Sequence, residues 1–595
     1  MPVVFTTSDT PEVRMWQPFE IQFEASGDYE NAYVEEEIWI DLKGPGFDKR
    51  VYGFWNGGKQ FCVRIAATAA GNWSWSSGAK TGDSGLSGKS GNFTATQWSA
   101  DELKANPNRR GMVGVGKNGH GLQYADGTSF FLVGDTWWSV PTFRFPLPDG
   151  SANTDLGPDS SLADYLQFRK EQGFNSVAMI TAQPCWADDG HAANLFDEDG
   201  LCVRNAWALK NGSAMPMHNE GGRPFEFPGK VPGFEDVVPD YDKVNPEYFK
   251  ILDEKMDLIF DMGFVPFVEV ARRDTGPMWQ KHYDWPESYA RFVQFIFTRY
   301  QAHNAILSPI HYDFFEKTIP SRDYNEPCNL VVDRWGKPPF GSLLSANPGP
   351  STLVNFGGPD ECRWLDMHQI GNSREHYTYW YLTEQYHADP ARPALNGEPY
   401  YSGLHALGEA YAYGKEGDTP DDDMYVRSGM YGSLLSGGFA GYIYGCEGIW
   451  QSSVEPEARN KMWDSFKWSS GRTVQHLEKF AFVKGDALYD LIPNAEHLIP
   501  NRNEETMGYE SWCYAAGNPE KNWFMLYFEA NCAQNIQMRG TKQQFQKFKA
   551  TWFDPRTGEW LPETVELETP RSMLLQLPER PDNSTDWGLM LEEVS

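Results

Sequence analysis

The sequence lacks the signals of membrane insertion, of a metal cage and of nucleotide binding. Its 595 residues contain no run of about 18 apolar residues, so we expect no membrane partner. The eight cysteines form no Cys-x-x-Cys pair and no His-Glu-x-x-His motif exists, which argues against a metal site. No Gly-x-Gly-x-x-Gly turn follows the first strand predicted for the central region, and no Gly-x-Ser-x-Gly elbow stands at a strand–helix turn. We therefore expect no cofactor, and we disfavour a serine hydrolase.

Positive charge is also scarce. The chain has 51 Lys and Arg against 82 Asp and Glu, a net charge of −31. Such a surface repels phosphate backbones, so we expect no nucleic-acid partner. The first residues, MPVVFTTSDTPEV, have neither a basic n-region nor an apolar h-region, which predicts no signal peptide in this chain. The location stays open: periplasmic or extracellular if Met1 replaces a removed signal, cytoplasmic otherwise.

The cysteines leave the disulfides undecided. Cys185–Cys202 and Cys328–Cys362 are both conceivable pairs. Cys446 lies in a glycine-rich, strand-like run, which predicts a buried free thiol. The oligomeric state is open as well, because ring-rich β-units could pair into a homo-oligomer.

Aromatic residues are plentiful, with 23 Trp, 28 Tyr and 37 Phe. Most of these rings are needed to fill a large core. Flat rings also stack on the apolar faces of sugars, so the composition suits a protein with a carbohydrate substrate.

The pattern of turns and apolar residues predicts a multidomain chain. Residues 1–98 contain short alternating strands separated by Gly and Asn turns, as in an immunoglobulin-like antiparallel β-sandwich. Residues 99–110 form a polar linker. Strands alternate with helices over 111–482, and the chain becomes β-rich again over 483–595, where we expect a second antiparallel β-sandwich.

The central region is predicted to be a (β/α)8 TIM barrel. Alternating strands and helices imply parallel strands with right-handed crossovers. Eight strand candidates match a closed barrel, and a doubly wound open sheet is the alternative. The candidates are 129–138, 175–183, 264–272, 305–314, 341–348, 364–372, 393–401 and 439–450.

In such barrels the active-site side chains sit at the C-terminal ends of the strands. The predicted ends carry carboxylates, amides, imidazoles and aromatic rings, the residue types that hold and cleave sugars. The adjacent positive charges of Arg272 and Arg273 leave open whether one subsite holds an acidic or sulfated sugar. The residues expected to bind substrate are Asp135, Trp137, Trp186, Arg272, His311, Tyr312, His368, Asn396, Tyr400, Tyr444, Glu447 and Trp450.

Two carboxylates are candidates for catalysis. Glu398 lies in the phrase NGEP at the end of the seventh strand, among amide and phenol groups that favour its ionised form, which suits a nucleophile. Asp313 follows an apolar run at the end of the fourth strand, where partial desolvation would raise its pKa, as a general acid requires. In a retaining enzyme the two carboxyl groups stand about 5–5.5 Å apart.

Three other glutamates are rivals. Glu326, in Asn325-Glu326-Pro327, spells the NEP found at the acid/base position of many barrel glycosidases, but it lies well past the fourth strand. Glu269 is a weaker rival. Glu447 could instead bind substrate or support the site.

Several phrases resemble the apiosidase-like glycoside hydrolases. DGTSFFLVGDTWW resembles the opening of their barrel, NGEPYYSG their nucleophile strand, and GGFAGYIYGCEGIWQ their last strand. WFDPRTGEW followed by DWGLMLEE resembles a C-terminal domain named for collagen binding. The resemblance implies that Asp313 is the acid/base and Glu398 the nucleophile. Where the family usually has Gly-Gly-Asp, this chain has His311-Tyr312-Asp313, so apiose specificity is not transferred.

These observations lead to two hypotheses. The first is a retaining glycoside hydrolase that acts on a plant or algal poly- or oligosaccharide by double displacement. The second is a carbohydrate- or matrix-binding protein whose barrel has lost catalysis, which the two flanking β-units permit. The presence of both carboxylates favours the first.

Overall fold

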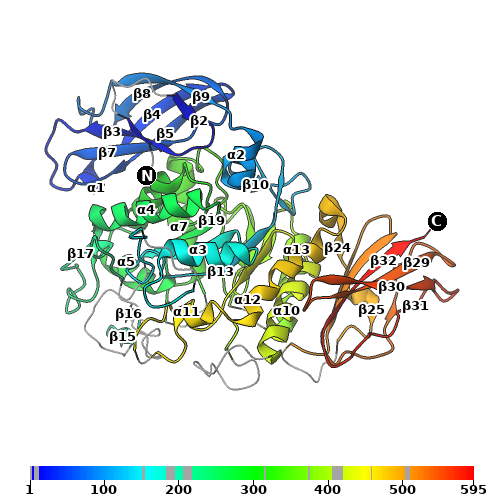
Figure 1. The fold of residues 1–595 in the computed structure, drawn as a ribbon. Helices are drawn as coiled ribbons and strands as arrows, with labels where there is room; N and C mark the ends of the chain where they lie inside the picture. The colour runs from blue at the N-terminus through cyan, green and yellow to red at the C-terminus, as the bar shows by residue number, and fades with distance from the viewer. Residues whose placement is uncertain are drawn as a thin grey trace.

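The computed structural model describes residues 3–5, 12–150, 155–182, 194–204, 217–313, 317–372, 375–404, 420–456, 458–502 and 509–594. It has three units in chain order: an N-terminal β-unit, a central unit of strands and helices, and a C-terminal β-unit (Figure 1). The two β-units lie against different sides of the central unit. No helix in the described ranges is long and apolar enough to cross a bilayer.

The N-terminal unit consists of two sheets around a shared apolar core. The first sheet has β1 (Val3–Phe5), β3 (Phe19–Glu24), β7 (Gln60–Ile65) and β6 (Phe54–Trp55); the second has β2 (Glu12–Arg14), β9 (Ser90–Thr96), β8 (Gly71–Ala79), β4 (Ile38–Gly44) and β5 (Phe47–Tyr52). Side chains alternate between buried and partly exposed along β4, as a half-buried strand requires. The expectation of a purely antiparallel unit is wrong at two edges, because β1 pairs with β3 and β2 with β9 in parallel.

The central unit contains a parallel sheet of seven strands in the order β20-β19-β14-β13-β23-β22-β21. The strands are β13 (Leu132–Thr136), β14 (Ser176–Ala182), β19 (Val265–Ala271), β20 (Ile306–Ser308), β21 (His368–Ile370), β22 (Ala394–Asn396) and β23 (Gly441–Tyr444). Each lies inside one of the predicted segments. All of their residues are buried, as in sheets covered on both faces.

The remaining predicted strand, 341–348, forms bridges in place of a regular strand. Leu344 makes a parallel bridge to Leu307 of β20, and Asn347 makes one to His311. The amides of Asp366 and Met367, just before β21, donate to the carbonyl of Leu344. This segment therefore lies between β20 and β21, the two edge strands of the sheet.

Helices cover the outer face of this sheet (Figure 1). They include α3 (Leu162–Glu171), α4 (Pro246–Asp261), α5 (Gly276–His282), α6 (Glu287–Tyr300), α7 (Asn325–Arg334), α8 (Thr352–Phe356), α9 (Trp380–Tyr386), α10 (Pro420–Leu435), α11 (Met462–Ser465), α12 (Ser469–Thr473) and α13 (Gln475–Ala481). Local sequence explains where two of them begin. Ser161 and Asp164 form a capping box at α3, and Asn245 caps α4 ahead of Pro246 in its first turn.

The C-terminal unit has two antiparallel sheets around its own apolar core. One contains β24 (Ile492–Pro493), β26 (Cys513–Gly517), β27 (Trp523–Phe528), β32 (Trp587–Glu593), β29 (Lys547–Asp554) and β30 (Glu559–Glu568); the other contains β25 (Leu498–Ile499), β28 (Gln537–Met538) and β31 (Leu575–Gln576). The β29–β30 hairpin turns at Gly558, whose φ is +72°, a conformation that favours glycine.

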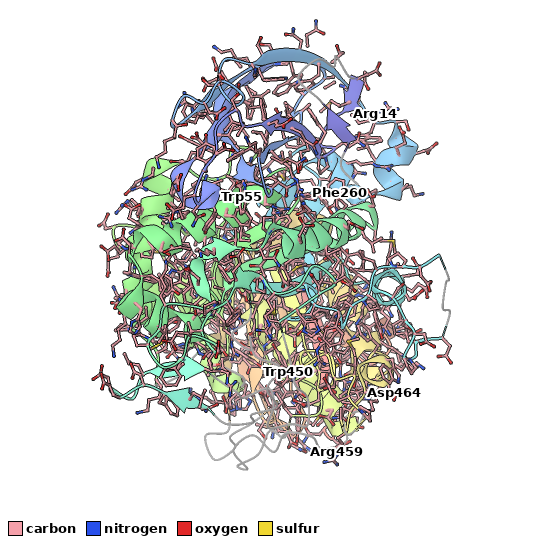
Figure 2. The ribbon with its side chains drawn as sticks, turned by 90° about the vertical axis from the view of Figure 1, so that its left-hand side faces the viewer. Arg14, Trp55, Phe260, Trp450, Arg459 and Asp464 are labelled. Carbon is pink, nitrogen blue, oxygen red and sulfur yellow. The ribbon has the colours of Figure 1, made fainter. Side chains whose placement is uncertain are left out.

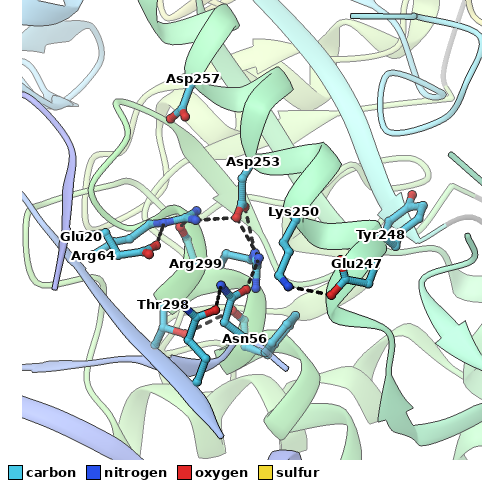
Figure 3. A network of polar contacts seen from close by, with 12 residues as sticks. Glu20, Asn56, Arg64, Glu247, Tyr248, Lys250, Asp253, Asp257, Thr298 and Arg299 are labelled. Carbon is cyan, nitrogen blue, oxygen red and sulfur yellow. Dashed lines mark hydrogen bonds and ion pairs between the residues drawn. The ribbon is translucent and has the colours of Figure 1, made fainter. Parts of the chain in front are cut away.

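A buried ionic network joins the N-terminal unit to helices α4 and α6 (Figure 3). Arg64 of β7 pairs with Glu20 at 2.9 Å and also with Asp253 of α4. Arg299 of α6 pairs with the same Asp253 at 2.7 Å and donates to Asn56 at 2.8 Å. Burial raises the pKa of Asp253, but the two guanidinium groups outweigh it and lower that pKa to about 2. The two units are thus held together by charges as well as by apolar packing.

The cysteines settle two of the expectations. Cys328 and Cys362 are buried free thiols, so the disulfide considered between them is absent. Cys446 is a buried free thiol, as predicted. Cys185 lies outside the described residues, and the other conceivable disulfide with it.

Candidate active site

The C-terminal ends of the strands point away from the N-terminal unit. Trp450, which follows the last strand β23, lies at the end of the central unit far from that unit, whereas Trp55 and Phe260 lie at their boundary (Figure 2). Glu269, Arg272, His311, Asp313 and Glu398 all come from strand ends on the Trp450 side.

Backbone hydrogen bonds fix the segment that carries Asp313. The amide of His311 donates to Ala271 at 2.8 Å, and the amide of Arg273 donates back to His311 at 2.9 Å. On the other side, the amide of Tyr312 donates to Asn347 at 2.8 Å. The chain after β20 is therefore held between its two neighbours up to Asp313.

Three cationic side chains surround the Asp313 carboxylate. Arg273 Nη1 lies 2.6 Å from Oδ1, Arg272 Nη2 lies 3.2 Å from Oδ2, and His311 Nε2 lies 3.1 Å from Oδ1. Burial raises the pKa of Asp313, but the charges of Arg272, Arg273 and His311 outweigh it and hold that pKa well below its ordinary value. The expectation that apolar neighbours raise the pKa of Asp313 is therefore wrong in the free protein. Arg272, which we expect to bind substrate, contacts the Asp313 carboxylate in this structure.

His311 is itself held by a second acid. Its Nδ1 makes a short contact with a carboxylate oxygen of Glu269, a residue of β19 that is 1% exposed. Burial lowers the pKa of His311, but Glu269 and Asp313 outweigh it and raise that pKa to about 10. Burial raises the pKa of Glu269 in turn. The three side chains form a continuous Glu269–His311–Asp313 chain with an imidazolium at its centre.

Glu398 follows β22 and faces Asp313. Its amide donates to Asn396 Oδ1 at 3.3 Å, which sets the turn after the strand, and its Oε2 accepts from Asn347 Nδ2 at 3.3 Å. One oxygen of Glu398 lies within 4.8 Å of one oxygen of Asp313. Both side chains are buried, at 5% and 7% exposure. The structure thus brings the two predicted catalytic carboxylates together.

The same cluster has the geometry of a metal site. His311, Asp313 and Glu398 each offer a ligand atom within 4.8 Å of the other two. However, the guanidinium groups of Arg272 and Arg273 already contact Asp313, and their charge opposes a further cation there. The electrostatics favour acid–base chemistry at this carboxylate pair.

The first strand shows how the alternation of side chains decides which residues reach the site. Asp135 pairs with Arg169 of α3 at 2.6 Å with neither side chain exposed, and the indole of Trp137 stacks on Phe145. Both side chains are therefore packed away from the carboxylate cluster, and a role for them in binding substrate stays a prediction. Trp138 points the other way and meets His311 edge-on, with centroids 4.8 Å apart. Residues two apart share a face of a strand, so Trp138 belongs to the site.

Three other expected ligands also face the helices. The Tyr444 hydroxyl lies 2.8 Å from Ser470 of α12, and His368 Nδ1 lies 2.9 Å from Thr352 of α8. Burial lowers the pKa of His368 to about 3, so this imidazole is neutral. Tyr312 donates to the Ile319 carbonyl at 3.0 Å. Each is held by a contact outside the carboxylate cluster, and its role in binding substrate stays a prediction.

Hydrogen-bonded polar side chains hold the turns that follow the last two strands of the sheet, β22 and β23. Tyr400 donates to Asp422 of α10 at 2.6 Å, and Glu447 accepts from Trp450 Nε1 at 2.9 Å. Asn396 donates to Ser433 of α10 at 3.1 Å. These side chains are buried and hold the turns that follow β22 and β23.

Two residues lie elsewhere. Trp186 falls outside the described residues. Glu326 is an exposed residue in the first turn of α7, where Asn325 donates to the Phe356 carbonyl at 2.8 Å. The phrase NEP therefore begins an outer helix, and Glu326 does not join the carboxylate pair.

Four members of the cluster were undervalued from the sequence: Trp138, Glu269, Arg273 and Asn347. Trp138 could have been found by choosing the other alternation of the first strand. Asn347 ends the fifth predicted strand, and the same strand-end rule applies to it. No sequence signal shows that Glu269 reaches His311 or that Arg273 reaches Asp313, because those contacts depend on how neighbouring strands align.

The comparisons with known proteins identify the family of the central unit. Residues 116–484 match the family described as "Apiosidase-like, catalytic domain". The chain belongs to the apiosidase-like family. This apiosidase-like chain is a glycoside hydrolase with a carbohydrate substrate, as predicted.

The flanking units match families as well. Residues 12–80 match a domain of unknown function, DUF5060, and residues 493–592 match the "Putative collagen-binding domain of a collagenase". The predicted resemblance is therefore confirmed along the apiosidase-like chain.

Solved structures show the same fold at low identity. A "putative glycoside hydrolase" from Bacteroides vulgatus ATCC 8482 is 16% identical with a TM-score of 0.64, over 98% of this chain and 100% of that one. A family 5 glycoside hydrolase from the same organism is 15% identical with a TM-score of 0.56, over 82% of this chain and 94% of that one. No curated protein matches this apiosidase-like chain significantly.

Proposed function

We propose that the protein is a retaining glycoside hydrolase in which Glu398 is the nucleophile and Asp313 the acid/base. The observation that carries this proposal is the approach of the two carboxylates, with oxygens within 4.8 Å across the strand ends. Retaining enzymes hold their carboxyl groups about 5–5.5 Å apart, whereas inverting enzymes leave room for a water molecule at about 6.5–9.5 Å.

The reaction proceeds in two displacements. A Glu398 oxygen bonds to the anomeric carbon while the bond from that carbon to the leaving oxygen breaks, and Asp313 gives its proton to that oxygen. Water then attacks the same carbon, Asp313 takes the proton of the water, and the bond to Glu398 breaks. Asn347, which contacts Glu398, is placed to orient the nucleophile.

The first displacement needs a proton on Asp313, whereas the free site favours its ionised form. The imidazolium of His311, with Nε2 at 3.1 Å from Asp313, is the nearest proton source. The ionised form suits the second displacement, in which Asp313 acts as a base. The surrounding cations therefore keep Asp313 in the ionised form that the second displacement requires.

We further propose that the sheet closes into an eight-stranded barrel through segment 343–347, and that both β-units are sandwiches. The bridges at Leu344 and Asn347 support the closure, and the two sheets around each shared core support the sandwiches. A plant or algal poly- or oligosaccharide is the proposed substrate class.

A glycan screen tests the proposal. Wild-type protein and Glu398→Gln are incubated with plant and algal poly- and oligosaccharides, and released reducing ends are measured. We expect hydrolysis of at least one glycan by wild type, and loss of turnover with retained binding in Glu398→Gln. Cleavage by this variant at the wild-type rate would overturn the assignment, and binding without cleavage by wild type would favour an inactive binding protein.

A further inference from the structure

A groove lies between the central unit and the C-terminal unit, apart from the carboxylate cluster. Its cavity of about 440 Å³ is lined on one side by residues from His376 to His387, which include α9, and on the other by residues around Asn501 and Trp512. This volume falls within the range of about 300–1,000 Å³ that is typical of ligand sites. None of its lining residues belongs to the catalytic cluster.

The groove presents aromatic faces. Trp380 is 53% exposed and is the one exposed Trp among the residues that the structure describes. Tyr381 stacks beneath it, with centroids 4.1 Å apart, so the indole is held as a flat platform. Deeper in the groove, Trp512 stacks on His376 at 4.0 Å, with Arg502 over the same indole. The exposed, supported indole therefore presents a flat apolar face to the groove, the kind of surface on which sugar rings stack.

The groove walls also hold polar atoms that lack a protein partner. His376 Nε2, Tyr379 Oη and Trp512 Nε1 are buried without a hydrogen-bond partner in the described part of the chain. Glu529 fixes the His376 ring by contacting Nδ1 at 2.9 Å, so its Nε2 has a defined direction. These atoms have almost no accessible surface, so they do not contact an occupant directly, and the fixed His376 ring instead supports the Trp512 indole that lines the groove.

The charges at the groove do not favour an ionic ligand. Glu384 and Glu496 line it together with Arg502, so acids and bases are mixed. An anionic sugar would meet the two carboxylates, and a cation would meet the guanidinium. A neutral ligand with flat apolar faces and many hydroxyls fits best, which describes a neutral sugar chain.

We propose that this groove is a second, non-catalytic carbohydrate-binding site that holds a neutral glycan chain on Trp380. Ring contacts connect it to the catalytic strand. The Tyr509 ring lies 6.4 Å from His376 and 5.0 Å from Tyr400, two residues after Glu398. A chain bound in the groove is thereby kept close to the rim of the active site.

Affinity electrophoresis tests this site without relying on catalysis. Native gels contain hydroxyethyl cellulose, xyloglucan or galactomannan, and a further gel contains gelatin. Glu398→Gln serves as the background, so that no substrate is consumed. We expect at least one neutral polysaccharide to retard it, and Trp380→Ala on that background to weaken binding about tenfold, equivalent to about 1.4 kcal/mol.

A matched control separates a specific platform from general stickiness. Phe545, at 54% exposure in the C-terminal unit, is an equally exposed ring outside the groove, and Phe545→Ala should bind as the background does. Equal retardation of the Trp380→Ala protein, or no retardation by any polysaccharide, would overturn the proposal. So would retardation by gelatin alone, which would indicate a protein ligand. Loss of hydrolysis with this binding intact would count only against the proposed reaction.

Discussion

Arg273 Nη1 lies 2.6 Å from Asp313 Oδ1, so the candidate acid/base is in a buried ion pair. A neighbouring cation lowers the pKa of a carboxyl group by about 1–3 units. Arg273→Gln should therefore raise the pKa of Asp313. Because a general acid must be protonated, the alkaline limb of the kcat/KM profile should move to higher pH.

The control for this shift is Arg334→Gln, because Arg334 pairs with Glu287 on the exposed face of α7. Its pH profile should match that of wild type. An unchanged alkaline limb in Arg273→Gln would show that Asp313 is not the group that titrates there.

His311 should carry its charge well above neutral pH because Glu269 holds it. Its pKa of about 10 exceeds the ordinary value of 6.5, so the stability from this charge is fully present below pH 6.5 and lost as pH rises through about 10. Glu269→Gln should lower the pKa of His311, measured by NMR titration of the imidazole. Urea unfolding should show a smaller loss of stability from pH 7 to 10 in Glu269→Gln than in wild type, and identical slopes would contradict the contact.

Trp137 and Trp138 should respond in opposite ways to replacement by Ala. Trp137 is completely buried against Phe145 and Phe466, so its loss should cost about 3–5 kcal/mol of unfolding free energy with little direct effect on substrate. Trp138 meets His311 at the site, and its loss should lower kcat/KM about tenfold, or about 1.4 kcal/mol. Thermal melts and initial rates distinguish them. A larger activity loss in a stably folded Trp137→Ala would reverse the assignment.

Arg64 should be essential to the joint between the N-terminal and central units. Arg64→Ala leaves Glu20 and Asp253 buried with one cation fewer, which should destabilise the protein by about 3–5 kcal/mol in chemical denaturation. Arg334→Ala, at a half-exposed pair, should stay within about 1 kcal/mol of wild type. Similar losses of unfolding free energy in both variants would mean that the buried network contributes no more stability than the exposed pair.

Much of the fold could be predicted from the sequence because its signals are local. Apolar runs between turns locate the seven sheet strands. The helix α7 is not predicted, because its NEP phrase is also typical of a catalytic motif. The parallel pairing of β1 and β2 depends on contacts far apart in the chain, which no local pattern records.

The sequence predicts where the candidate site lies better than it predicts which residues form it. The strand-end rule placed Asp313 and Glu398 on one side, and the structure brings them together. The same rule does not say which of two adjacent residues faces inward, so Trp137 was chosen over Trp138. Nor does it show that Arg272 and Arg273 neutralise Asp313, because that contact follows from the register between β19 and the chain after β20.

The anomeric configuration of the first product tests the central claim most directly. Wild-type protein is mixed with a glycan that it hydrolyses, and the anomeric proton of the released sugar is followed by NMR before mutarotation. Asp313 and Glu398, with oxygens within 4.8 Å, predict a product with the same configuration as the substrate. A product of the opposite configuration would show that water attacks directly and that Glu398 forms no glycosyl-enzyme.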